Sequence, residues 1–308
     1  MKPGRLFLAL ALLAVIILMT IFIYRSMMDI TTPRQAFEPP VRTQPQLPKQ
    51  DTVHVGVISR FSPNLLYEGY QPILDYLNRV TPYHFTLKLS SSYEQTVAQI
   101  EQDQIQAAFL GTFLYLKARK EHAIQCILKP LNSQFKPHFH SVIVTRSDSP
   151  IATIADLAGK KLALPSPLSF SGNWVIHYEF QKHGLKTGDL DSLHYFGFHH
   201  TVIYHVLRGN FDAGVVKDRV AEEFLNRGIR ILAASEPIPG SPIIVKKSLD
   251  TTITRALQEA LLQIDVLQPE YRDLVRQWDP EFAFGFAPAH DSDYDEIEKK
   301  IGAIEAVP

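Results

Sequence analysis

The sequence predicts a bilobal α/β fold preceded by one N-terminal transmembrane helix. Three observations lead to this class: an unbroken apolar run at residues 6–24, an alternation of strand-like and helix-like segments from residue 52, and a restart of that alternation near residue 150. A chain of 308 residues is long enough for one large or two modest domains with buried cores. We therefore expect a membrane anchor followed by two α/β lobes.

The anchor is predicted at residues 1–28. Lys2 and Arg5 precede an apolar run that, at about 1.5 Å per residue, approaches the roughly 30 Å hydrocarbon thickness of a bilayer. The run exceeds the ~7–15 apolar residues of a signal peptide, and no small-x-small cleavage site follows it. We predict an uncleaved signal anchor, with a cleaved signal peptide as the alternative. Because the basic flank favours the cytoplasm, the anchor crosses the cytoplasmic membrane once and the soluble domain lies in the periplasm or extracellular space.

A proline-rich linker is predicted at residues 29–51. Prolines stand at positions 33, 39, 40, 45 and 48, and apolar residues show little periodicity there. Such a composition is typical of a semi-extended tether between a membrane and a domain.

The first lobe begins with VHVGVIS at residues 53–59, an apolar, β-branched run typical of a buried parallel strand. Helical patterns and strand patterns then alternate. We expect helices at 65–80, 92–103 and 112–122, and strands at 84–89, 105–111 and 140–149. This order predicts a parallel sheet with helices on both faces.

The second lobe repeats the same alternation of strands and helices. We expect strands ending near residues 164, 198, 217 and 234, with helices through about His183 and at 199–209 and 218–228. The chain after residue 241 contains a strand and a long helix and returns to the first lobe. Lobe 1 is therefore predicted at 52–145 and 241–308 and lobe 2 at 146–240, joined by 142–150 and 236–245. Small-molecule sites in such proteins lie between lobes, at the carboxyl ends of strands.

Charge and cysteine content exclude several classes of function. The formal net charge is -1, from 31 basic and 32 acidic residues, and no basic tail is present, so we expect no nucleic-acid partner. Cys126 is the chain's lone cysteine, which excludes an intrachain disulfide and a multi-cysteine metal site. It lies in the apolar run AIQCIL, where a buried, inert thiol is expected.

The stretch PSPLSFSGNW, residues 165–174, is the first candidate site. Ser169, Phe170, Ser171 and Gly172 stand where a helix is predicted to begin, and amides at a helix start lack intrahelical acceptors. Serine hydroxyls add donors, and glycine allows a ligand to approach the backbone. Together they suit a tetrahedral oxyanion. The alternative is an ordinary serine N-cap, a contact worth about 1 kcal/mol.

Two further helix starts follow predicted strands. His199 and His200 begin one, and Gly111 and Thr112 begin the other. Three such termini after three strands favour a ligand site over a single cap.

Two other chemistries remain open. Ser171 with His199 and a later aspartate has the chain order of a hydrolase, but G-x-S-x-G is not matched. His138 and His140 share a strand face and, with the 199–200 pair, suggest zinc, but no acidic ligand motif accompanies them. We expect no metal, no cofactor and no catalysis.

These motifs resemble the phosphate/phosphite/phosphonate-binding family of ABC-transporter periplasmic solute-binding proteins. Residues 167–172 resemble that family's P-x-S-T-S-G opening, residues 198–199 its histidine corner, and residues 110–111 its glycine turn; the resemblance extends over about 53–298. It implies a type 2 periplasmic binding protein fold with two crossover segments. It also implies that Ser169, Ser171 and His199, with the amides of 170–172, hold phosphonate oxygens.

The chain departs from that pattern at three places. Phe109 and Leu110 replace the tryptophan or tyrosine often seen before Gly111. Phe170 replaces a threonine, and the region that carries acidic groups in relatives that bind aminoalkyl phosphonates contains Lys217, Asp218 and Arg219 here. The resemblance thus implies a monomeric receptor that closes on a small oxyanion and delivers it to an ABC permease. The alternative partner is a sensor kinase, with an oxyanion or an arsenic species as the signal.

Overall fold

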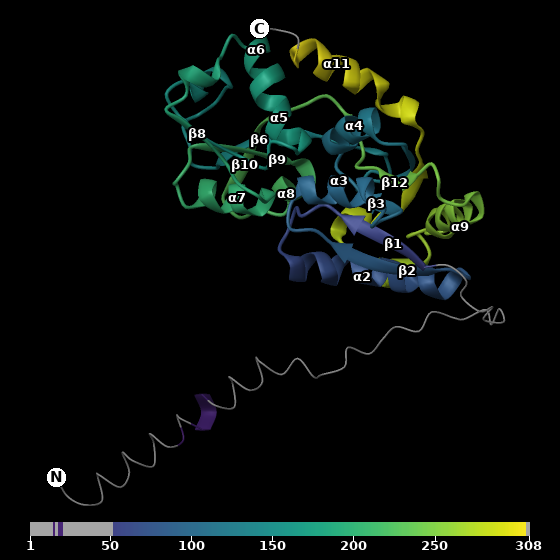
Figure 1. The fold of residues 1–308 in the computed structure, drawn as a ribbon. Coiled ribbons are helices and arrows are strands. Elements are labelled where there is room, and N and C mark those ends of the chain that lie inside the picture. The colour runs from purple at the N-terminus through teal and green to yellow at the C-terminus, as the bar shows by residue number, and fades with distance from the viewer. Residues whose placement is uncertain (1–14, 16–17, 21–51, 306–308) are drawn as a thin grey trace, which may run out of the picture. The chain divides into compact units, whose positions relative to one another are not determined.

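The computed structural model describes residues 15, 18–20 and 52–305, and the chain divides into two units, Met1–Gln44 and Pro45–Pro308 (Figure 1). In the first unit, Val15 and residues 18–20 are helical and exposed. The helices of the described residues include none that is long and apolar enough to cross a membrane. Most of the predicted anchor at 6–24 and all of the linker at 29–51 lie outside the described residues.

The second unit contains two lobes, each built on a mixed sheet, which confirms the bilobal α/β prediction. The first sheet has the order β13-β4-β12-β3-β1-β2. Its strands are β1 (Thr52–Val57), β2 (His84–Leu89), β3 (Ala107–Phe109), β4 (Ile124–Pro130), β12 (Ile243–Lys246) and β13 (Phe286–Pro288).

This first sheet is not all-parallel, contrary to the prediction. β1 pairs in parallel with β2 and β3, but β12 runs antiparallel to β3 and β4, and β13 antiparallel to β4. The chain returns from the second lobe at the carboxyl ends of the parallel strands. A strand that starts at that edge must run down the sheet against its neighbours.

The second sheet has the order β10-β6-β9-β7-β8. Its strands are β6 (Ser141–Arg146), β7 (Lys161–Leu164), β8 (Ser192–Tyr195), β9 (Ala213–Lys217) and β10 (Ile229–Ala234). β7 is parallel to β8 and β9, whereas β6 is antiparallel to β9 and β10.

The first crossover lies earlier in the chain than predicted. Strand β6 was expected in lobe 1 and in the crossover 142–150, but Ser141 pairs with Lys217 within the second sheet. The two crossovers are instead β5 (His138–Phe139) and β11 (Ile238–Pro239), which pair with each other in antiparallel fashion. The border of lobe 1 therefore precedes β6 and does not fall at residue 145. An apolar run alone does not say which of two sheets a strand joins.

Helices cover both sheets. Lobe 1 carries α2 (Pro63–Val80), α3 (Tyr93–Glu101), α4 (Thr112–Glu121), α9 (Thr251–Leu262), α10 (Pro269–Val275) and α11 (Asp295–Glu305). Lobe 2 carries α5 (Phe170–Trp174), α6 (Phe180–Lys182), α7 (His199–Leu207) and α8 (Asp218–Glu222). A π-helical turn, Val175–Glu179, joins α5 to α6 into one helical run. α8 ends before the predicted residue 228, where Gly228 takes a left-handed φ of 92° in the turn to β10.

An apolar cluster continues from one lobe into the other. Phe113 and Leu116 of α4 belong to the same buried cluster as Phe170 and Trp174 of α5. The lobes are therefore packed against each other in this structure.

Candidate functional site

A small cavity of about 40 Å³ lies between the lobes, beside the crossovers. Its walls come from the carboxyl ends of strands and the starts of helices α3, α4, α5 and α7, where ligand sites of α/β proteins occur. The lining residues are Ile58, Arg60, Tyr93, Gly111, Thr112, Phe139, Ser169, Phe170, Ser171, His199, Lys217 and Ser241.

Six of the eight predicted site residues meet in this cavity. They are Gly111, Thr112, Ser169, Phe170, Ser171 and His199. The other two, Gly172 and His200, do not line it. A Cβ at position 172 would lie 2.3 Å from the carbonyl oxygen of Ser166, so this glycine allows helix α5 to pack on the preceding loop. His200 is half-buried outside the cavity, where its Nε2 lies 2.9 Å from a carboxylate oxygen of Glu223.

The two serines of the stretch have different roles. The Ser169 Oγ accepts the amide proton of Gly172 at 3.0 Å and donates to the carbonyl of Ser166 at 2.8 Å. Its hydroxyl is therefore used by the N-cap of α5 and is not a free donor, contrary to the role that the family pattern implied. The Ser171 hydroxyl lines the cavity and forms no hydrogen bond to any residue that the structure describes.

His199 is an uncharged hydrogen-bond donor. Its Nδ1 accepts the backbone N–H of Lys217 at 3.2 Å, which leaves the proton on Nε2. Burial, followed by the charge of Lys217, lowers the pKa of His199 to about 3. The imidazole is therefore uncharged at neutral pH and can donate one N–H to a bound anion.

The N-termini of α4 and α5 differ in which hydrogen-bond donors are available to a ligand. Thr112 donates its hydroxyl to the carbonyl of Pro239 at 2.9 Å, which ties α4 to a crossover strand. Gly111 caps that helix without a side chain, and a Cβ there would approach only Ile58, at 3.4 Å. The amides of Phe170 and Ser171 come before the first intrahelical bond of α5 and are free for a ligand.

An apolar wall completes the cavity. Phe170 is buried and stacks on Trp174, with ring centroids 5.4 Å apart. It also meets Phe139 edge to face at 6.1 Å. The aromatic ring that replaces the threonine of the family pattern therefore fills space at the cavity wall.

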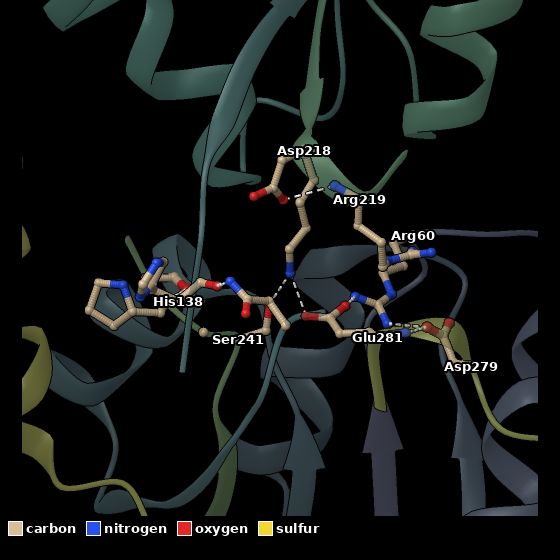
Figure 2. A network of polar contacts seen from close by, with 12 residues as sticks. Arg60, His138, Asp218, Arg219, Ser241, Asp279 and Glu281 are labelled. Atoms are coloured by element: carbon tan, nitrogen blue, oxygen red, sulfur yellow. Dashed lines mark hydrogen bonds and ion pairs between the residues drawn. The ribbon is translucent and has the colours of Figure 1, made fainter. Parts of the chain in front are cut away.

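Charged groups flank the cavity on the lobe 1 side (Figure 2). Arg60, only 7% exposed, forms ion pairs with Asp279 and Glu281 and donates to the hydroxyl of Tyr70. Burial opposes its charge and is the largest single influence, but Asp279, Tyr70 and Tyr93 together outweigh it and raise the pKa of Arg60. Among the described residues, its buried Nε has no hydrogen-bond partner.

Lys217 links the two lobes through Glu281. Its Nζ lies 2.5 Å from Glu281 Oε1 and 3.3 Å from Ser241 Oγ. It also stands 4.2 Å from the ring centroid of Phe139. Burial, then repulsion by Arg60, lowers the pKa of Lys217 well below its ordinary value. The ion pair with Glu281 opposes this shift, because a carboxylate at 2.5 Å favours the charged ammonium.

Six lining residues are absent from the predicted site: Ile58, Arg60, Tyr93, Phe139, Lys217 and Ser241. Arg60 and Tyr93 each follow a strand of the parallel part of sheet 1, and that position at a carboxyl edge was an available signal. Burial raises the pKa of Tyr93 to about 12, so its hydroxyl is a neutral donor, and it forms no hydrogen bond to a described residue. Phe139 lies in a crossover strand that the sequence pattern placed elsewhere. Glu281, which pairs with Arg60 across 221 positions, carried no local signal.

Cys126 is buried, and burial raises the pKa of its thiol to about 12. Its backbone N–H donates to Asp291 at 3.0 Å, away from the cavity-lining residues. The thiol is protonated and enclosed, as the apolar run around it predicted. The described residues contain no group of three or more His, Cys, Asp or Glu side chains that could hold a metal ion.

Comparisons with known proteins give one consistent family. Residues 55–294 match the family described as ABC transporter, phosphonate, periplasmic substrate-binding protein. The phosphonates-binding periplasmic protein of Escherichia coli (strain K12) is 22% identical over 217 residues. That match covers 66% of this chain and 63% of the relative, so the chain spans somewhat less than two thirds of that relative's length.

Solved structures are similar in fold. A binding protein component of an ABC phosphonate transporter from Pseudomonas aeruginosa aligns with a TM-score of 0.71 at 16% identity, covering 84% of this chain and 90% of that one. PhnD1 from Prochlorococcus marinus, solved in complex with methylphosphonate, aligns with a TM-score of 0.72 at 17% identity, covering 83% and 98%. These likenesses confirm the predicted bilobal periplasmic binding protein fold.

Proposed function

Because this chain belongs to the family of periplasmic substrate-binding proteins of phosphonate ABC transporters, we propose that it binds a small oxyanion of the phosphonate, phosphite or phosphate type between its lobes. The observation that carries the proposal is the set of unused donors around the cavity. These are the Ser171 and Tyr93 hydroxyls, the Nε2–H of His199 and the first amides of α5. Enclosed polar groups without partners are costly, and an oxyanion satisfies several at once.

The size of the cavity supports a compact ligand. About 10–15 Å³ of such volume holds one water molecule, so 40 Å³ corresponds to about three water sites. An ion with three or four oxygens around one central atom occupies similar space. Phe170 and Phe139, which face each other edge to face, limit further room.

Ligand binding would favour the closed form because both lobes supply contacts. Tyr93 and Arg60 belong to lobe 1, whereas Ser171, His199 and Lys217 belong to lobe 2. An anion that touches both sets binds the closed arrangement better than the open one and shifts the population toward it. We propose that an ABC permease recognises this closed form and receives the ligand from it.

The site geometry favours binding over turnover. In a Ser-His-Asp site, the histidine accepts the serine proton on Nε2 while a carboxylate accepts from Nδ1. Here Nδ1 of His199 accepts a backbone N–H from Lys217, so Nε2 carries a proton and is a donor. We therefore propose a receptor in preference to the serine hydrolase.

We further propose that the receptor is held at the outer face of the cytoplasmic membrane by residues 6–24. The support is the unbroken apolar sequence and the exposure of its described side chains: Val15, Leu18 and Met19 are 61%, 66% and 63% exposed. Fractionation of cells followed by alkaline washing of the membranes tests this. An anchored receptor stays with the membrane after alkaline washing, whereas recovery in the wash contradicts the anchor.

The binding proposal is tested by thermal unfolding of the full-length protein, purified in a mild detergent, with phosphite, phosphate, methylphosphonate and sulfate. A ligand that binds only the native state raises the Tm. We expect at least one phosphorus oxyanion to do so, and Ser171→Ala to remove most of the shift with little change in the Tm of the ligand-free protein. Loss of one hydrogen bond to a charged group weakens affinity by about tenfold to a hundredfold. No shift with any anion would refute the proposed ligand class.

A further inference from the structure

A second, larger cavity adjoins the small one. It measures about 230 Å³ and is lined on one side by the crossover residues His138, Phe139 and His140. Phe139 and Lys217 line both cavities. These two side chains are therefore the partition between the small proposed oxyanion site and a space more than five times as large.

The ammonium of Lys217 is fixed in this partition from three directions. Glu281 Oε1 lies at 2.5 Å, Ser241 Oγ at 3.3 Å and the ring centroid of Phe139 at 4.2 Å. Figure 2 shows Glu281 and Ser241 approaching the same nitrogen from the lobe 1 side. Because Lys217 is only 9% exposed, its position is set by these contacts and not by solvent.

The two cavities differ in charge. Arg60 and Lys217 line the small cavity, whereas Asp279 and Glu281, which neutralise them, do not. The large cavity is lined by the carboxylates of Asp218, Glu222 and Glu281 as well as by Lys217 and Arg219. A substituent that leaves the oxyanion toward the larger space must pass the ammonium before it reaches those carboxylates.

We propose that Lys217 determines specificity at the oxyanion site: with Phe139 it restricts the ligand to a compact oxyanion, and its charge excludes ligands whose substituent is a cation. This inference rests on the proposed function. Two like charges a few ångströms apart repel strongly in an enclosed site, since little water screens them. Phe139 contributes volume and a ring contact to the ammonium but no charge of its own. The partition therefore has a charged part and an uncharged part that mutations can separate.

The test compares two ligands of nearly equal size. Propylphosphonate and 2-aminoethylphosphonate differ in that a terminal methyl replaces an ammonium, so the ratio of their Kd values reports the charge of the partition. Titration calorimetry on the full-length protein should show 2-aminoethylphosphonate binding about a hundredfold more weakly than propylphosphonate, the effect expected of one close like charge. Both should bind more weakly than methylphosphonate.

Two variants separate the contributions of Lys217 and Phe139 to ligand specificity. Lys217→Met keeps an unbranched side chain one atom shorter and removes its charge, so the Kd ratio should fall to within about tenfold of unity. Phe139→Ala removes volume and the ring contact but leaves the Lys217–Glu281 pair in place, so propylphosphonate should bind more tightly while 2-aminoethylphosphonate remains disfavoured. A ratio near unity in the parent, or a ratio unchanged by Lys217→Met, overturns the inference. If the parent binds neither methylphosphonate nor phosphite, it is the proposed function that fails instead.

Discussion

The two lobes bring different chemistry to the same cavity. Lobe 2 supplies neutral donors at helix starts, Ser171 and His199, for which no described residue is an acceptor. Lobe 1 supplies Arg60, whose charge is already neutralised by Asp279 and Glu281. The neutral side is therefore suited to recognising an anion, and the charged side to holding the lobes together through Lys217 and Glu281.

Glu281→Gln should cause the largest loss of stability, because it removes a carboxylate from the charged network of lobe 1. It leaves Arg60 and Lys217, both less than 10% exposed, without a shared carboxylate. Breaking a buried ion pair by removing one partner costs about 3–5 kcal/mol, so chemical denaturation should show a loss of that order. The exposed Glu222 offers a matched control, Glu222→Gln, with little change. An unchanged free energy of unfolding in Glu281→Gln would mean that this network does not hold the lobes.

The pH dependence of stability tests whether His199, on the lobe 2 side of the cavity, is buried in its uncharged form. The pKa of His199 is about 3 in the folded chain and near 6.5 when unfolded, so the unfolded chain binds the extra proton between these values. The stabilisation from this group is complete above pH 6.5 and is lost as the pH falls toward 3. Between pH 7.5 and pH 5 it should fall by about 2 kcal/mol.

His199→Asn removes the titrating group while keeping an acceptor for the Lys217 amide. This variant should lose less stability than the parent over the same pH interval in urea titrations. His200→Gln, at the neighbouring position outside the cavity, is the control. Equal losses in the parent and in His199→Asn would show that His199 is not the buried neutral donor described here.

Ser169→Ala should have the smallest effect, about 1 kcal/mol of stability, because its hydroxyl caps α5. It lowers the Tm of the ligand-free protein but keeps most of the anion-induced shift, the reverse of Ser171→Ala. Thermal unfolding with and without anion separates the two serines. If Ser169→Ala abolished the anion shift while leaving the ligand-free Tm unchanged, the cap and the donor would have been assigned the wrong way round.

The sequence predicted the strongly periodic elements because local patterns determine them. α2 and the serine-capped α3 are examples, since Ser92 accepts the Gln95 amide as a cap should. Strand direction and sheet membership could not be read in this way. β6 is as apolar as a lobe 1 strand, and only its pairing with β9 and β10 shows which sheet it joins.

The site was predictable in part for the same reason. Three helix starts carried short, readable motifs, and these bring six of the eight candidates to one cavity. The polar network depends on pairs far apart in the chain, such as Arg60 with Glu281. Whether a serine is a cap or a donor depends on where its proton goes, and the carbonyl of Ser166 that takes it was not evident from residue types.

A crystal structure of the full-length protein grown with methylphosphonate tests the central claim most directly. The account predicts the phosphonate group between the lobes, with its oxygens within hydrogen-bond distance of Ser171 Oγ, His199 Nε2 and the first amides of α5. Lys217 should remain paired with Glu281 beside it. A phosphonate bound away from these donors, or closed lobes with no anion between them at saturating concentration, would contradict the account.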